Sequence, residues 1–68
     1  MNPKLFRTLR KINGLTQLEL AERLNVSPSL ITKIETGARK CAPKLSEKVV
    51  EEFGVEQVSQ VAELTKLN

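Results

Sequence analysis

Between residues 28 and 36, small, polar and basic side chains recur at the spacing of one helical face. At about 100° per residue, this face holds Pro28, Ser29, Thr32, Lys33 and Thr36. Hydroxyl and ammonium groups on a slim helical face can donate hydrogen bonds to base edges in the major groove of DNA. The pattern therefore indicates a helix able to contact nucleic acid, although a merely solvated helix face would show the same polarity.

Groups for acid–base, nucleophilic or metal chemistry are almost absent. The chain has no His and only one Cys, Cys41. A His-activated Ser or Cys nucleophile is therefore excluded, as are a Cys/His zinc cluster and an internal disulfide. We expect no enzymatic activity, no metal and no cofactor, and 68 residues leave little room for the pocket of a small-molecule effector. We interpret Cys41 as an incidental thiol rather than as a redox sensor.

Charge is unevenly distributed along the chain. Residues 1–44 carry nine basic residues and three glutamates, a net charge of +6, whereas residues 45–68 carry two lysines and five glutamates, a net charge of −3. A basic segment of this kind favours a polyanionic partner, although many small domains are mildly basic. No apolar run exceeds two residues. We therefore expect neither a membrane-spanning helix nor a signal peptide, and we expect the protein to be cytoplasmic.

The elements that carry these residues are predicted to be helices only. A single domain over residues 1–68 divides at its Pro, Gly and Asn residues into five short helices, and no segment alternates like a strand. Side-chain caps, prolines and one capping box mark where the helices begin. The predicted starts are Asn2-Pro3, the capping box Thr16–Glu19, Ser27-Pro28, about Pro43, and Val55. The fold class expected from this pattern is an all-α bundle.

Apolar side chains recur within these helices at intervals of three and four residues, as on a core-facing stripe. The residues expected to face inward are Leu5, Leu9, Ile12, Leu20, Ala21, Leu24, Leu30, Ile31, Ile34, Leu45, Val49, Val50 and Phe53. Leu18 falls off its stripe and is expected to be exposed. Asn25, between the second and third helices, tolerates the left-handed backbone of a tight turn. This short turn is typical of a helix-turn-helix, here residues 16–37.

Residues 9–37 resemble the helix-turn-helix of the Cro/repressor (Xre-type) family of phage and bacterial transcription regulators. The matching sequence is LRKINGLTQLELAERLNVSPSLITKIETG. The shared features are G-L-T-Q-x-E-L-A, V-S at the turn, I-x-x-I-E-x-G at the end of the third helix and F-G-V at the end of the fourth. The likeness covers residues 4–55. It implies a lambda-repressor-like fold that docks its third, recognition helix in the major groove.

The resemblance also implies which residues touch DNA. Base contacts would come from Pro28, Ser29, Thr32 and Lys33, and phosphate contacts from Thr16, Gln17, Ser27, Thr36, Arg39, Lys40 and Lys44. Lys33 is the best base reader of the first set, with guanine as its expected target. Pro28 and Ser29 stand where some phage repressors have paired glutamines, and proline has no N–H to donate. Arg10 and Glu35 match a largely buried ion pair of the family, which we interpret as structural.

The fifth helix is predicted to serve as a dimer interface. One recognition helix reads only a few base pairs, so this fold normally binds a near-palindromic site as a two-fold dimer. Within the acidic segment 55–68, the expected contacts are Val55, Val58, Val61 and Leu64. The sequence leaves an alternative open, in which this apolar arc caps the monomer's own core and Leu64 and Leu67 lie in a frayed tail.

These observations favour a sequence-specific, double-stranded DNA-binding transcription regulator. We expect a Cro-type repressor that acts as a homodimer in the cytosol of a bacterium or of a phage-infected cell. The alternative is a protein-interaction module, an antirepressor- or antitoxin-like subunit built on the same fold. Such a module would present apolar or acidic residues on the third helix, whereas Ser29, Thr32 and Lys33 are polar or basic.

Overall fold

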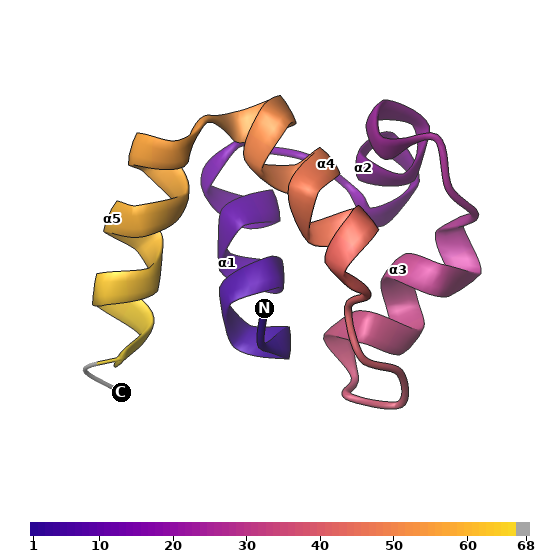
Figure 1. Cartoon of the computed structure of the whole chain (residues 1–68). Helices are drawn as coiled ribbons and strands as arrows, with labels where there is room; N and C mark the ends of the chain where they lie inside the picture. The colour runs from indigo at the N-terminus through magenta and orange to yellow at the C-terminus, as the bar shows by residue number, and fades with distance from the viewer. Residues whose placement is uncertain (67–68) are drawn as a thin grey trace.

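Five helices form the computed structural model, which describes residues 1–66. Figure 1 shows the helices α1 (Pro3–Ile12), α2 (Gln17–Leu24), α3 (Pro28–Glu35), α4 (Pro43–Phe53) and α5 (Val55–Lys66). Leu67, one of the two residues considered for a frayed tail, and Asn68 lie outside the described residues. Residues 1–66 contain no strand. The prediction of an all-α bundle of five short helices is confirmed.

Side-chain caps begin α1 and α3 where the sequence predicts them. The first N–H groups of a helix have no carbonyl partner within it, so an oxygen from the preceding residue stabilises them. The carboxamide oxygen of Asn2 accepts a hydrogen bond from Leu5 N at 2.7 Å. The hydroxyl of Ser27 accepts one from Leu30 N at 3.2 Å. These contacts fix the residues at which the two helices begin.

A tight turn separates α2 from α3 and sets the geometry of the pair. Asn25 has a φ of 57°, in the left-handed region that asparagine tolerates better than most residues. Val26 N donates to Ala21 O at 3.0 Å and closes the carboxyl end of α2. The side chain of Val26 packs half-buried against the core. The predicted turn is confirmed.

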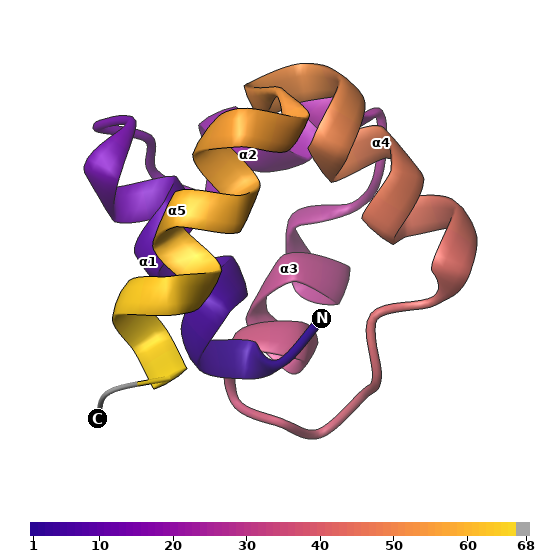
Figure 2. The same cartoon turned by 60° about the vertical axis from the view of Figure 1, so that its left-hand side comes forward.

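The core lies between the five helices. Its buried side chains are Leu5, Phe6, Leu9, Leu15, Leu20, Ala21, Leu24, Ile31, Ile34, Leu45, Val49 and Val61. α2 packs on α3 and α4, α1 packs on α3 and α5, and α4 packs on α5. Figures 1 and 2 show α3 and α5 on opposite sides of α1. The two segments to which the sequence assigns base contacts and dimer contacts are therefore well separated.

The carboxyl end of α1 departs from the prediction. Ile12 was expected to face inward, but it is 53% exposed. The chain turns back at Gly14, which has a φ of 67°, and Leu15 reaches the core there, with only 8% of its surface exposed. Three other expected core residues are half-buried: Leu30, Val50 and Phe53. Leu18 is 56% exposed, as predicted.

α5 divides the predicted dimer residues between core and surface. Val61 is 3% exposed and belongs to the core, so it offers no surface to a partner and its assignment to an interface is corrected. Val58 is half-buried against the same core. Val55 and Leu64 are 67% and 57% exposed. The physical reason is that α1 and α4 leave apolar side chains that only the inner arc of α5 covers.

Candidate nucleic-acid interface

α3 turns its polar face to solvent. Ile31 and Ile34 are no more than 1% exposed, and their burial fixes the rotation of the helix about its axis. The residues left exposed on α3 are Pro28, Ser29, Thr32 and Lys33. The structure therefore brings all four predicted base-contact residues onto one accessible face, which carries an ammonium group and two hydroxyl groups.

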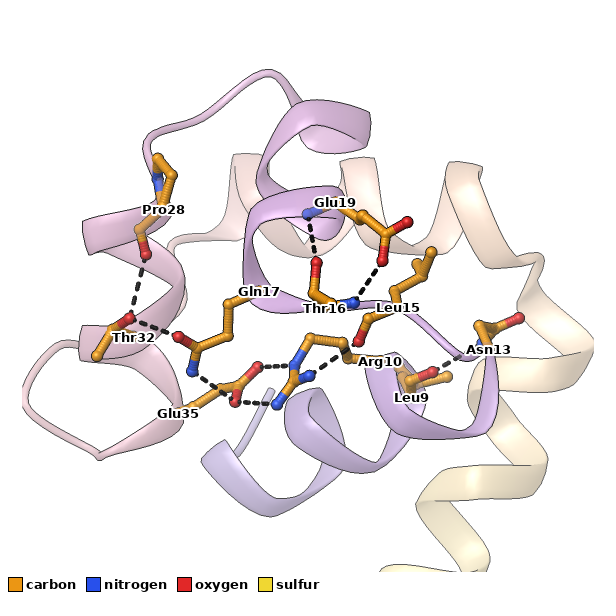
Figure 3. A network of polar contacts seen from close by, with 10 residues as sticks. All are labelled: Leu9, Arg10, Asn13, Leu15, Thr16, Gln17, Glu19, Pro28, Thr32 and Glu35. Carbon is orange, nitrogen blue, oxygen red and sulfur yellow. Dashed lines mark hydrogen bonds and ion pairs between the residues drawn. The ribbon is translucent and has the colours of Figure 1, made fainter.

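An ion pair between α1 and α3 supports that face from within. Arg10 Nε lies 2.7 Å from Glu35 Oε2, and a second guanidinium nitrogen lies 2.9 Å from Glu35 Oε1. The third nitrogen donates to the carbonyl oxygen of Leu15 at 2.8 Å. The side chains of Arg10 and Glu35 are only 12% and 4% exposed. This two-point geometry, seen in Figure 3, is the structural pair that the sequence predicts.

The environment of the pair keeps both members charged. Burial tends to raise the pKa of Glu35, but hydrogen bonds from Arg10 and Gln17 and the positive charge of Arg10 outweigh burial and lower this pKa below its ordinary value. The hydrogen bond to Glu35 raises the pKa of Arg10. Glu35 therefore accepts hydrogen bonds as a carboxylate at neutral pH, and its negative charge is neutralised within the fold rather than presented on the exposed face of α3.

Gln17, at the start of α2, links this ion pair to the exposed face. Its carboxamide Nε2 donates to Glu35 Oε1 at 3.2 Å, and its Oε1 accepts a hydrogen bond from the hydroxyl of Thr32 at 2.8 Å. Figure 3 shows Arg10 from α1, Gln17 from α2 and Glu35 and Thr32 from α3 converging at this point. Gln17 was predicted to hold a phosphate. Its carboxamide joins α2 to α3, a contact that the spacing in sequence does not reveal, and the phosphate contact stays a prediction.

The start of α2 is closed by the predicted capping box. The hydroxyl of Thr16 accepts from Glu19 N at 3.1 Å, and the carboxylate of Glu19 accepts from Thr16 N at 2.9 Å. The hydrogen bond from the Thr16 N–H is the main cause that lowers the pKa of Glu19. Within residues 1–66, the N–H groups of Gln17 and Leu18 remain as the donors at this end that an anion could use.

The linker after α3 folds back on the carboxyl end of that helix. The carbonyl oxygen of Lys33 accepts hydrogen bonds from the Thr36 hydroxyl and from Arg39 N, both at 3.2 Å. Gly37 makes the bend with a φ of 81°. Three of the predicted phosphate-contact residues follow in exposed positions: Arg39 and Lys40 in the linker, and Lys44 in the first turn of α4. The structure thus places a basic, solvent-facing loop directly after the exposed face of α3.

The comparison with known proteins identifies this arrangement. The chain matches the helix-turn-helix family over residues 6–56. It belongs to the helix-turn-helix family. The Xre/Cro-type resemblance is confirmed, and the chain is a DNA-binding protein of the transcription-regulator class. No curated protein and no solved structure matched it in the corresponding searches.

One feature of the helix-turn-helix domain was missed from the sequence. α4 begins with Pro43, and Ala42 in front of it has no side-chain oxygen to cap the helix. The N–H groups of Lys44 and Leu45 therefore have no side-chain cap, and they are donors suited to an anion. The signal was available: the first three helices start after Asn, Thr and Ser, whereas the fourth starts after Ala.

Residues 1–66 of the helix-turn-helix protein contain neither a candidate membrane span nor a candidate metal cluster. No helix there is long and apolar enough to cross a membrane. The same residues contain no group of three or more His, Cys, Asp or Glu side chains that could hold a metal ion. Cys41 is a half-buried free thiol in the linker, with its sulfur 3.4 Å from the hydroxyl oxygen of Ser46.

Proposed function

We propose that this protein is a Cro-type repressor that binds a near-palindromic operator as a homodimer and acts by occupancy, without catalysis and without a cofactor. The observation that carries the proposal is the exposed face of α3. It presents Ser29, Thr32 and Lys33 to solvent, while Glu35, the acid of that helix, is paired inside the fold. A face with donors and no free carboxylate suits the electronegative major groove.

The proposed division of labour follows from side-chain chemistry. Lys33 reads a base, with guanine O6 and N7 as its expected partners. The phosphate backbone is held by the basic loop, defined by Arg39 and Lys40, and by Lys44 in the first turn of α4, together with the free N–H groups at the starts of α2 and α4. Phosphate contacts position the domain, whereas α3 supplies the choice of sequence. A bound repressor then excludes RNA polymerase from an overlapping promoter in the bacterial or phage-infected cytosol.

The dimer is proposed because a single α3 covers too few base pairs for a specific site in a genome. The two exposed apolar residues of α5, Val55 and Leu64, are its expected contacts. α5 packs on α1 and α4 and leaves α3 uncovered, so a second copy on α5 would not compete with DNA for the recognition helix.

The test is selection of binding sites from a random pool of double-stranded DNA, followed by affinity measurements over a range of salt concentrations. We expect an enriched near-palindrome with half-sites about 34 Å apart. The logarithm of the binding constant should fall with the logarithm of salt with a slope of about −0.9 for each phosphate contacted. If the selection enriches no sequence and the protein shows no salt-dependent binding to DNA, the proposal is overturned and a protein-interaction module is favoured.

A further inference from the structure

The hydroxyl of Thr32 lies on the exposed face of α3, but its proton is directed into the protein. Its Oγ1 is 2.8 Å from Gln17 Oε1 and 3.3 Å from the carbonyl oxygen of Pro28. Both neighbours are acceptors, and a hydroxyl group has one proton and two acceptor lone pairs. Thr32 therefore donates within the protein whichever neighbour it uses, and what it can offer to a ligand is its acceptor capacity.

Glu35 decides which way the Gln17 carboxamide points. The carboxylate accepts from Gln17 Nε2 at 3.2 Å while both of its oxygens are held by Arg10. An ionised carboxylate can only accept hydrogen bonds. If the carboxamide rotated by 180°, its oxygen would face the carboxylate and the attraction would become repulsion. The amide oxygen must then face Thr32, as Figure 3 shows.

We propose that Thr32 meets DNA as a hydrogen-bond acceptor, and that Gln17 is the positioning residue that takes its proton. This inference rests on the proposed function and deepens it. In the major groove, adenine N6 and cytosine N4 are donors, whereas guanine O6 and N7 and thymine O4 are acceptors. The base that Thr32 faces is therefore adenine or cytosine, although the hydroxyl of an unconstrained threonine would fit either class.

Lys33, the neighbour of Thr32, has the opposite polarity. Its ammonium group can only donate, and within residues 1–66 it has no hydrogen-bond or ion-pair partner. Side by side on α3, the two side chains would distinguish a base with an amino group from a base with acceptors only. The buried pair of Arg10 and Glu35 thus acts on sequence choice through Gln17, without itself touching DNA.

The experiment compares sites selected from random double-stranded DNA by the wild type and by four variants. Thr32→Val keeps the shape and removes the hydroxyl, so the base position at which its selected sequences change identifies the base under Thr32. Thr32→Ser keeps the hydroxyl and should retain the wild-type preference there. Gln17→Met removes the carboxamide and frees the Thr32 proton. Gln60→Met, on the exposed surface of α5, is the matched control and should select the wild-type sequence.

In the wild type we expect adenine or cytosine at that position, favoured roughly two- to tenfold over guanine or thymine, the range for one hydrogen bond. Gln17→Met should reduce this preference toward one and leave the preference under Lys33 unchanged. A general loss of stability or of phosphate contacts would weaken all sequences equally and would not change a single position. Guanine or thymine in the wild type, or an unchanged preference in Gln17→Met, overturns the inference.

A measurement on the free protein keeps the test independent of DNA and of the folding of the variants. By NMR, the hydroxyl proton of Thr32 should exchange with water more slowly than that of Ser29, which is exposed on the same helix and whose hydroxyl has no hydrogen-bond partner within residues 1–66. Equal exchange rates would contradict the relay through Gln17. If the wild type selects no DNA sequence at all, the proposed function fails, and this exchange measurement still decides the hydrogen bond.

Discussion

Arg10 and Glu35 are 25 residues apart in the chain, yet they form a two-point ion pair at 2.7 and 2.9 Å between α1 and α3. The carboxylate also holds Gln17 of α2. One buried acid thus ties together the three helices that carry or support the exposed face of α3. Desolvation of both ions offsets most of the attraction between them, so the intact pair adds little net stability. Removing one partner is costly, because the other charge then stays buried and unpaired.

Arg10→Ala should destabilise the fold, because it leaves the Glu35 carboxylate buried and without its cation. For a largely buried pair this costs about 3–5 kcal/mol of the free energy of unfolding. Denaturant unfolding monitored by circular dichroism measures it. The control is Arg23→Ala, whose partner Glu52 lies 3.2 Å away in an exposed pair, with an expected cost of about 0–1 kcal/mol. Unchanged stability of Arg10→Ala with lost DNA binding would make Arg10 a DNA contact instead.

Acid should destabilise the protein in part through Glu35. The pKa of Glu35 is lower in the folded state than its unfolded value of about 4.3, so the unfolded state binds more protons in acid. The stabilisation is fully present above the unfolded pKa and is lost as the pH falls through the folded pKa. Unfolding curves between neutral pH and strong acid measure this. Glu35→Gln should be less stable at neutral pH, and its free energy of unfolding should fall less steeply as the pH is lowered into the acid range.

Glu19 supplies the comparison for that pH dependence. Its pKa is also lowered, by hydrogen bonds to Thr16, but its side chain is on the surface. Glu19→Gln should therefore reduce the acid-induced loss of unfolding free energy less than Glu35→Gln does. A steeper effect of Glu19→Gln would assign the acid sensitivity to the capping box rather than to the buried pair.

Lys33→Ala and Lys40→Ala should impair DNA binding in different ways. Lys33 is exposed on α3 and Lys40 is exposed in the basic loop. Lys33→Ala is expected to lose on the order of 1–3 kcal/mol on the selected site and to relax the choice at one base pair. Lys40→Ala should weaken binding to selected and random DNA alike. It should also reduce the magnitude of the salt slope by about 0.9, the contribution of one phosphate contact. Equal losses on both kinds of DNA for Lys33→Ala would show that Lys33 does not read a base.

Val55→Asp and Leu64→Asp should give folded monomers if α5 forms the dimer. Both side chains are mainly exposed, and Val55 is the first residue of α5, where a negative charge is compatible with the helix dipole. Sedimentation at tens of micromolar, with and without the selected DNA, reports the oligomeric state. Each variant should still bind a half-site weakly and lose the preference for paired half-sites. A wild type that sediments as a monomer in both conditions would refute the dimer.

Val61→Asp separates an interface effect from a folding effect. Val61 is 3% exposed in the core, so a carboxylate there should unfold the domain rather than produce a monomer. A folded Val61→Asp protein would contradict the packing of α5 on α1 and α4.

The sequence alone determined the helices and the orientation of the main polar face. Helix starts depend on contacts between residues three apart, such as Asn2 with Leu5 and Ser27 with Leu30, and such local contacts can be read from the order of residues. The rotation of α3 follows in the same way, because a helical period of 3.6 residues puts Ile31 and Ile34 on the face opposite Thr32.

Only the tertiary structure decided which groups are already committed inside the protein. The sequence predicts DNA contacts for both Gln17 and Thr32, and only the structure shows that their side chains hydrogen-bond to each other across 15 residues of chain. Ile12 and Val61 both fitted an amphipathic pattern, yet the first is exposed and the second is buried. The physical reason is that periodicity gives the direction of a side chain from its own helix, whereas burial and hydrogen-bond partners depend on the helix that packs against it.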